Sequence, residues 1–359
     1  MIRSRIARHG IDCDDTQAGI LWANWFRDQQ VLKRRQALLA ETFDQDWQWM
    51  DRDAIRSRLC TTRYHDALFE PRAFHFHPLK YASGMVQVAA AQGVAVFAQS
   101  PAVSLAKSGH GWRITTPSGT VEAKHVVLAC GGFPHDRQRI AQLFAHAPGG
   151  TEHLSAAPKG NTGDGLRLGE SVGAQVACDL PHAAAWAPVS RVAREDGGFS
   201  GFPHLMERAK PGFIAVRQDG RRFVNEADAY HDYMRALFEA TGPTETPVSW
   251  LICDHRAQRR YGLGWSKPFP FPTAGYVRKG YLFKAATLAA LAQQCGIDAQ
   301  QLQATVSSFN QHAEHGHDPQ FQRGESLYNK AQGEALHGPN PALGRLRQGP
   351  FYAVRLVPG

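Results

Sequence analysis

Two glycine clusters in the middle of the chain have the residue types and spacing to hold a flat ligand. The apolar run 126–130 ends at the pair Gly131 and Gly132. Such a run is typical of a buried parallel strand that stops at a ligand crevice, where glycines let the ligand approach the backbone closely. A second cluster, with Gly163 and Gly165, precedes the apolar-periodic residues of an expected helix. Taken singly, each glycine also fits an ordinary turn.

Hydrophobic periodicity and turn residues predict the elements that surround these clusters. Asp51, Asp254 and Asp298 stand where a helix N-cap is expected. The predicted strands are 19–23, 94–97, 126–133, 248–254 and 350–359, with hairpins over 112–123 and 216–223, and the predicted helices are 28–43, one opened by Asp51, 78–91, 288–294 and one that follows Asp298.

Three motifs carry a family resemblance. They are Ala-Cys-Gly-Gly-Phe at 129–133, Gly-Asn-Thr-Gly-Asp-Gly at 160–165 and Gly-Arg-Arg-Phe-Val-Asn-Glu at 220–226. Through them, residues from about 126 to 359 resemble the fumarate reductase/succinate dehydrogenase flavoproteins, and more closely their 3-ketosteroid Δ1-dehydrogenase branch. The resemblance covers about two thirds of the chain. It implies an FAD-dependent oxidoreductase that desaturates a CH–CH bond beside a carbonyl by hydride transfer to flavin N5, or that catalyses the reverse ene reduction.

The resemblance also implies which residues contact FAD. The backbone of the first glycine cluster would lie along the adenosine. The backbone of the second cluster would lie near the ribityl chain or the flavin ring. Asn225 and Glu226, which end the third motif, would connect the second domain to the flavin. These cofactor-binding candidates are Val103, Ala129, Gly131, Gly132, Thr162, Gly163, Asp164, Gly165, Asn225 and Glu226.

Tyr230 is the catalytic candidate. In fumarate reductases the position four residues after this Asn-Glu pair carries a proton-delivering arginine, whereas the 3-ketosteroid dehydrogenases carry a tyrosine base there; the tyrosine argues against fumarate reduction. A phenol titrates near ~10, so it needs a neighbouring positive charge or hydrogen-bond donors to act as a base. His231 could assist, although neighbours on a strand face opposite ways. The alternative interpretation of Tyr230 is a half-buried aromatic without a chemical role.

The expected fold class is α/β with an α+β second domain, that is, an incomplete two-dinucleotide-type FAD domain with an inserted capping or substrate domain. The expected divisions are an FAD-binding domain at 1–190, a capping domain at 191–350 and the start of a return to the FAD domain at 351–359. Residues 1–60 contain no G-x-G-x-x-G fingerprint. The glycines at 163, 165 and 169 resemble this fingerprint, but the spacing between the second and third glycine is one residue too long. We therefore expect a chain that is truncated at both ends.

Residues 1–125 point to another branch of flavoenzymes. The segments 9–14 and 75–82 resemble the interior of D-amino-acid-oxidase-type FAD oxidoreductases. An amine or amino-acid oxidase is therefore an alternative function. A second alternative is a non-catalytic pseudo-flavoprotein without bound FAD, which the missing fingerprint supports.

Composition excludes several other classes. The 359 residues carry a formal charge of +8, but their Lys and Arg are dispersed, which disfavours nucleic-acid binding. No apolar run reaches the ~20 residues of a membrane helix. Six cysteines without a CxxC pair indicate reduced thiols and a cytoplasmic protein, and neither they nor the 17 histidines form a metal pattern.

The substrate is expected to be a small, hydrophobic carbonyl compound. Aromatic residues of the second domain could line its pocket, although aromatics are more often core. They are Trp186, Trp250, Trp265, Phe269 and Phe271. No residue identifies the electron acceptor.

Overall fold

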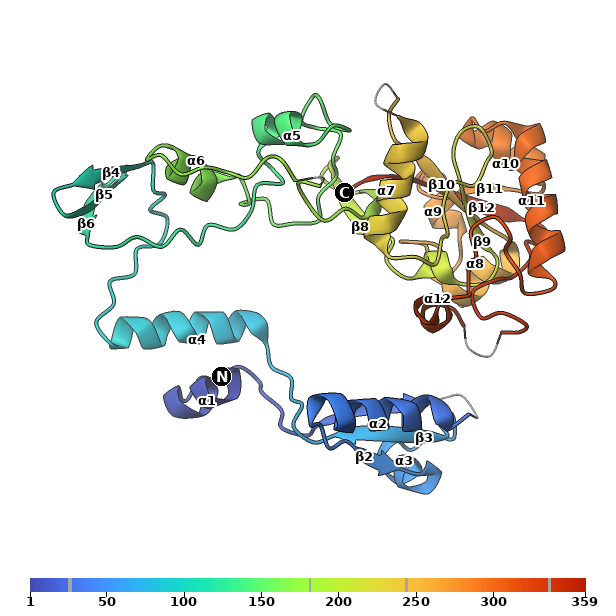
Figure 1. The fold of residues 1–359 in the computed structure, drawn as a ribbon, viewed down its shortest axis with the longest axis horizontal. Helices are drawn as coiled ribbons and strands as arrows, with labels where there is room; N and C mark the ends of the chain where they lie inside the picture. Colours follow the sequence, from blue (N-terminus) through green and yellow to red (C-terminus); the bar gives the residue numbers. More distant parts are fainter. Residues whose placement is uncertain (25–27, 181, 243–244, 335–336) are drawn as a thin grey trace. The chain divides into compact units, whose positions relative to one another are not determined.

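The computed structural model of the chain describes residues 1–24, 28–180, 182–242, 245–334 and 337–359. The chain divides into two compact units, Met1–Pro101 and Ala102–Gly359 (Figure 1). Both units combine helices with open sheets, in agreement with the predicted mixed class.

The first unit contains a small antiparallel sheet of order β1-β3-β2. The central strand β3 buries Ala67 and Leu68 completely. Asp51 caps α3 by accepting hydrogen bonds from the amides of Asp53 and Ala54, as predicted. The elements are α1 (Ile2–His9), β1 (Ile20–Asn24), α2 (Gln30–Phe43), β2 (Gln48–Met50), α3 (Arg52–Leu59), β3 (Asp66–Glu70) and α4 (Pro78–Ala91).

The second unit begins with the antiparallel sheet β4 (Ser104–Ser108), β5 (Gly111–Thr116) and β6 (Gly119–Ala123). The predicted hairpin over 112–123 is confirmed by the β5–β6 pairing. Helices α5 (Arg137–Leu143) and α6 (Asp164–Glu170) follow.

Two predicted strands are wrong in this structure. Residues 94–97 and 126–133 form no strand, and Val127 is 87% exposed. A parallel strand is stable only between hydrogen-bonded neighbours. No strand in the described parts of the chain pairs with either segment, so their apolar side chains have no sheet to join.

The largest sheet has six strands in the order β8-β7-β12-β10-β9, with β11 also paired to β12. It includes residues on both sides of the expected domain limits at 190 and 350, so those limits stay predictions. The strands are β7 (Pro188–Ala193), β8 (Phe199–Pro203), β9 (Phe213–Val216), β10 (Ser249–Cys253), β11 (Phe283–Ala285) and β12 (Phe351–Pro358).

Helices cover both faces of this sheet, because its central strands are apolar on both sides. On β10, Leu251 packs into one core and Ile252 into the other. Figure 1 shows α7 on one side of the sheet and α10 and α11 on the other. The turn, the remaining helices and their bounds are η1 (Glu207–Ala209), α7 (Tyr230–Thr241), α8 (His255–Tyr261), α9 (Ala274–Arg278), α10 (Leu288–Cys295), α11 (Ala299–Ala313) and α12 (Leu327–Gln332).

Candidate functional site

The two glycine clusters lie side by side. The amide of Gly163 donates a hydrogen bond to the carbonyl oxygen of Gly132 at 3.1 Å. The amide of His135 donates one to the carbonyl oxygen of Asn161, also at 3.1 Å. The structure therefore brings together residues 129–132 and 162–165, which the sequence analysis singled out separately.

Close approach explains why glycine occupies these positions. Gly163 has φ +77°, and a Cβ there would lie 2.8 Å from Oδ2 of Asp136. Gly131 has φ +75°, and its Cβ would lie 2.6 Å from Oδ1 of Asn161. A side chain at either position would strain the backbone and displace the neighbouring Asn161 or Asp136 side chain.

Charged side chains fix the second cluster. Asp136 caps α5 and pairs with Arg167, which also donates to the carbonyl oxygen of Thr162 at 2.7 Å. Asp164 pairs with Arg167 and accepts a 3.0 Å hydrogen bond from the Thr162 hydroxyl. The polar side chains of Thr162 and Asp164 are thus engaged within the loop.

The first cluster leaves a strip of small residues open. Ala129, Gly131 and Gly132 are exposed. The amides of the two glycines make no hydrogen bond to any residue that the structure describes. Unused backbone donors beside a side-chain-free surface suit the ribose and phosphate oxygens of a dinucleotide. The residues present therefore fit this part of FAD.

Val103 lies next to β4, which contacts α6. Its side chain is 59% exposed, and its amide donates to the carbonyl oxygen of Thr115 at 2.8 Å. Because this amide is used within the sheet, the backbone group of Val103 that remains available is its carbonyl oxygen.

Tyr230 begins helix α7 and is 40% exposed, so the expectation that it lies on a strand is wrong. The helix is anchored by the buried side chains of Tyr233, Met234 and Leu237. On a helix, successive side chains point about 100° apart. His231 accordingly faces elsewhere: its Nδ1 accepts a 3.2 Å hydrogen bond from the amide of Trp186.

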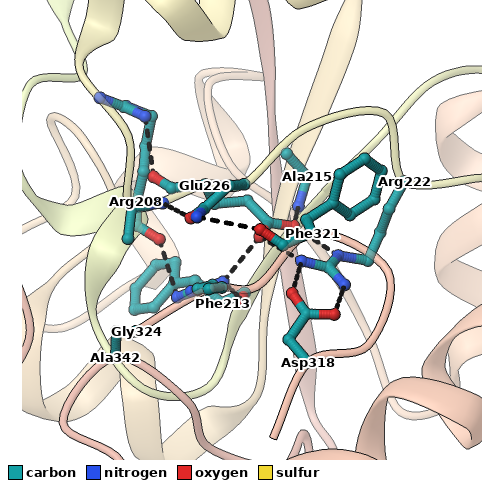
Figure 2. Close-up of polar contacts among 12 residues, drawn as sticks. Arg208, Phe213, Ala215, Arg222, Glu226, Asp318, Phe321, Gly324 and Ala342 are labelled. Carbon is teal, nitrogen blue, oxygen red and sulfur yellow. Dashed lines mark hydrogen bonds and ion pairs between the residues drawn. The ribbon is translucent and has the colours of Figure 1, made fainter. Parts of the chain in front are cut away.

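Glu226, four residues before Tyr230, is completely buried. Its carboxylate accepts two hydrogen bonds from Arg222, at 2.8 and 2.7 Å, and one from Arg323 at 2.9 Å (Figure 2). The amide of Ala215 donates a fourth at 3.0 Å. Burial alone would raise the pKa of Glu226, but Arg222 and Arg323 outweigh it and lower this pKa to about 2. Glu226 is therefore ionised at neutral pH.

Asn225 is also engaged by protein groups. Its Nδ2 donates to the carbonyl oxygen of Phe321 at 3.2 Å and to Oδ1 of Asn329 at 2.9 Å. Its Oδ1 accepts from the amide of Ala227. The side chains of Asn225 and Glu226 thus order the segment that leads to Tyr230, and their predicted contact with FAD stays a prediction.

Arg208 was missed by the sequence analysis, and no local pattern distinguishes it from a surface arginine. It is 1% exposed. Its guanidinium donates to the carbonyl oxygens of His204 at 2.7 Å, Glu226 at 2.8 Å, and Leu205 and Asp228 at 3.3 Å each. One buried side chain therefore holds the turn that immediately precedes Tyr230.

The five aromatic candidates separate into two groups. Trp186 and Trp250 are core residues, at 4% and 5% exposed. Trp265, Phe269 and Phe271 are exposed, and Trp265 lines a cavity of about 360 Å³. Burial of the first two follows from their places against α7 and on the central strand β10.

Within the described residues, no helix is long and apolar enough to cross a membrane. Nor do the His, Cys, Asp and Glu side chains of these residues form a group of three or more that could hold a metal ion.

Comparison with known proteins places the chain in a family. A family model described as "FAD binding domain" matches residues 27–359. The chain is 35% identical to 4-oxocyclohex-2-ene-1-carboxylate 5-dehydrogenase of Sinomonas cyclohexanicum, over 77% of this chain and 48% of the relative. It is 37% identical to 3-oxosteroid 1-dehydrogenase of Mycolicibacterium smegmatis, over 67% of this chain and 42% of the relative. Fumarate reductases also match.

A solved structure of 3-ketosteroid Δ1-dehydrogenase from Sterolibacterium denitrificans matches with a TM-score of 0.66 and 26% identity, covering 92% of this chain and 57% of that one. The chain spans about half the length of the curated relatives it matches. The predicted resemblance, fold class and cofactor are confirmed by these matches. The chain belongs to the FAD-binding-domain family of flavoproteins.

Proposed function

We propose that this chain serves FAD-dependent dehydrogenation of a CH–CH bond beside a ring carbonyl. The observation that carries the proposal is Tyr230, an accessible phenol at the start of α7 whose preceding turn is fixed by buried Arg208 and Glu226. A general base must be held rigidly yet reach the substrate, and this arrangement provides both. Relatives named as oxocyclohexene carboxylate and 3-oxosteroid dehydrogenases support it.

In this reaction Tyr230 would act as the general base. The carbonyl acidifies the hydrogen on its α-carbon, and the phenolate oxygen of Tyr230 takes that proton. FAD would supply the two-electron acceptor for the hydride that leaves the neighbouring carbon. The substrate loses H⁺ and H⁻ and gains a C=C bond. Tyr230 then returns its proton to solvent through its exposed side.

FAD would be held chiefly through backbone. We assign the open strip at Ala129, Gly131 and Gly132 and the carbonyl of Val103 to its adenosine side. The loop 162–165 would contact the ribityl chain or the flavin ring. Asn225 and Glu226 would connect the expected capping domain to the flavin. The support for this assignment is the junction of the two glycine clusters and the unused amides of the strip.

The substrate class and the cellular setting belong to the same proposal. A small, hydrophobic carbonyl compound suits the exposed aromatics at Trp265, Phe269 and Phe271. All six cysteines are free thiols, which supports a cytoplasmic protein.

The test is flavin retention followed by anaerobic reduction. The 359-residue protein is mixed with FAD, desalted and scanned for flavin absorbance. We expect retained bands that bleach with a cyclohexanone-type ketone or a 3-ketosteroid. Bleaching by amines alone would favour the oxidase alternative. No retained flavin would favour the non-catalytic alternative for this chain.

A further inference from the structure

A cavity of about 360 Å³ lies beside β7, β12 and the segment that contains α9. Its size is within the range of small-molecule sites. Tyr230 is not among its lining residues. The cavity is lined by three cationic side chains, Arg191, Lys279 and Arg355, and by aromatic side chains that include Trp265, Tyr276 and Tyr281.

The cations of this cavity have no anionic partner in the described protein. No Asp or Glu lines the cavity, and neither Arg191, Lys279 nor Arg355 forms an ion pair with any described carboxylate. The guanidinium of Arg191 instead lies over the Phe199 ring at 5.6 Å. Three unpaired positive charges around one cavity favour an anionic occupant.

Two of these charges lie on neighbouring strands. Arg355 belongs to β12 and Arg191 to β7, and both line the cavity just beyond the point where the pairing of these strands ends, at Val357 and Val189. Like charges that line one cavity repel each other. Burial and then the nearby Arg191 lower the pKa of Arg355, in keeping with an uncompensated pair of cations. A bound anion between them would remove this repulsion.

The aromatic wall of the cavity is fixed by a buried hydrogen-bond chain. Trp265 donates its amide hydrogen to the Tyr281 hydroxyl at 2.7 Å, and that hydroxyl is 2.8 Å from Oγ of Ser190. Ser190 Oγ lies 2.7 Å from Nε2 of His204, whose Nδ1 is 2.6 Å from Glu207.

This hydrogen-bond chain holds the Tyr281 ring in place at the cavity. Burial raises the pKa of Tyr281 to about 12, so its hydroxyl is protonated at neutral pH. The wall presents ring surface, and the cations supply the charge recognition.

We propose that this cavity binds a small organic acid in which one carboxylate is attached to a six-membered ring. The carboxylate would lie between Arg355 and Arg191, where guanidinium groups can donate paired hydrogen bonds, and the ring would pack on Tyr276, Tyr281 and Trp265. Binding here requires neither FAD nor Tyr230, so this proposal goes beyond the proposed dehydrogenase function and is tested separately from it.

The test is calorimetric titration of the 359-residue protein with benzoate and, as a neutral probe of the same shape, benzamide. We expect benzoate to bind more tightly than benzamide. Arg355→Gln and Arg191→Gln should each weaken benzoate at least about tenfold, the loss expected for one charged hydrogen bond. Arg256→Gln removes an exposed arginine on α8, outside the cavity, and should leave the affinity unchanged.

Three results would overturn the proposal: no benzoate binding to the wild-type chain, equal affinity for benzamide and benzoate, or equal weakening by Arg256→Gln and the two cavity variants. Circular dichroism spectra identify a variant that does not fold, in which case the other cavity variant decides.

Discussion

Arg323 donates a hydrogen bond to the Glu226 carboxylate at 2.9 Å, and neither side chain is exposed to solvent. The two residues are 97 positions apart. Arg323 also donates to the carbonyl oxygens of Arg208, Lys210 and Phe213. This contact therefore joins the turn before Tyr230 to the segment that follows α11.

Glu226→Gln is expected to destabilise the protein strongly. The variant leaves the buried cations Arg222 and Arg323 short of a negative charge, and breaking a buried pair in this way costs about 3–5 kcal/mol. Urea unfolding measures the change. The control is Glu239→Gln, because Glu239 is exposed and pairs with Arg235 on the surface of α7; its expected change is below about 1 kcal/mol. Equal losses in the two variants would contradict the assignment.

The wild-type protein is expected to lose stability between pH 6.5 and 4 because of His146 and His153. Burial lowers the pKa of each imidazole to about 4 from 6.5. Since the folded pKa lies below the unfolded value, the contribution is complete above pH 6.5 and is lost as the unfolded chain binds protons. At about pH 5 the expected loss is about 2 kcal/mol, after halving for partial exposure.

Urea unfolding at several pH values checks this loss. His146→Phe should roughly halve the loss over this range, because His153 still titrates, whereas phenylalanine can fill the space among Trp186, Phe144 and Phe238 without titrating. An unchanged profile would mean that other groups cause the acid sensitivity. Glu226, whose pKa is lowered to about 2, acts at lower pH: its contribution is complete above about pH 4.5 and is lost as the pH falls towards 2.

Gly163→Ala is expected to abolish FAD retention, and Gly173→Ala to preserve it. Both glycines have positive φ, +77° and +94°, so alanine strains both by about 1 kcal/mol. Only the Cβ at 163 meets another group, Oδ2 of Asp136, whereas that at 173 meets nothing within 4 Å. Flavin absorbance after desalting distinguishes them. Parallel behaviour of the two variants would attribute the effect to backbone strain alone.

Tyr230→Phe is expected to reduce kcat of the FAD-loaded enzyme by at least about a hundredfold, the usual contribution of a general base. Its thermal unfolding temperature should change little, because the side chain is 40% exposed. Tyr328→Phe provides the control, since Tyr328 is 47% exposed on α12. Full activity in Tyr230→Phe would remove this residue from the reaction.

Local patterns in the sequence predicted several elements correctly. Helix α11 begins after Asp298, whose side chain accepts a hydrogen bond from the amide of Gln301, and it buries Leu302, Val306 and Phe309 as their spacing predicts. Strand β10 and the cap at Asp254 also appear where expected. These features depend on residues a few positions apart, so the sequence contains the information directly.

Some candidate site residues could be recognised from the local sequence, and others could not. The glycines were recognisable because a positive φ or a close backbone approach requires that residue type, and their motifs pointed to FAD. Arg208 and Arg323 were not recognisable, because an arginine that donates to distant carbonyl oxygens has the same local sequence as one on the surface. The apolar run 126–133 misled for the related reason that a strand requires partners, which the sequence pattern does not supply.

The sequence by itself therefore determined the helices α2, α3, α4, α10 and α11, the hairpin over 112–123, the family and its cofactor, since each is encoded over short spans. Only the tertiary structure decided that Tyr230 begins a helix, that Glu226 is held by Arg222 and Arg323, and that Arg191 and Arg355 share one cavity. Burial and the interaction of charges far apart in the chain depend on which segments pack together, and that is a property of the fold rather than of any short stretch of residues.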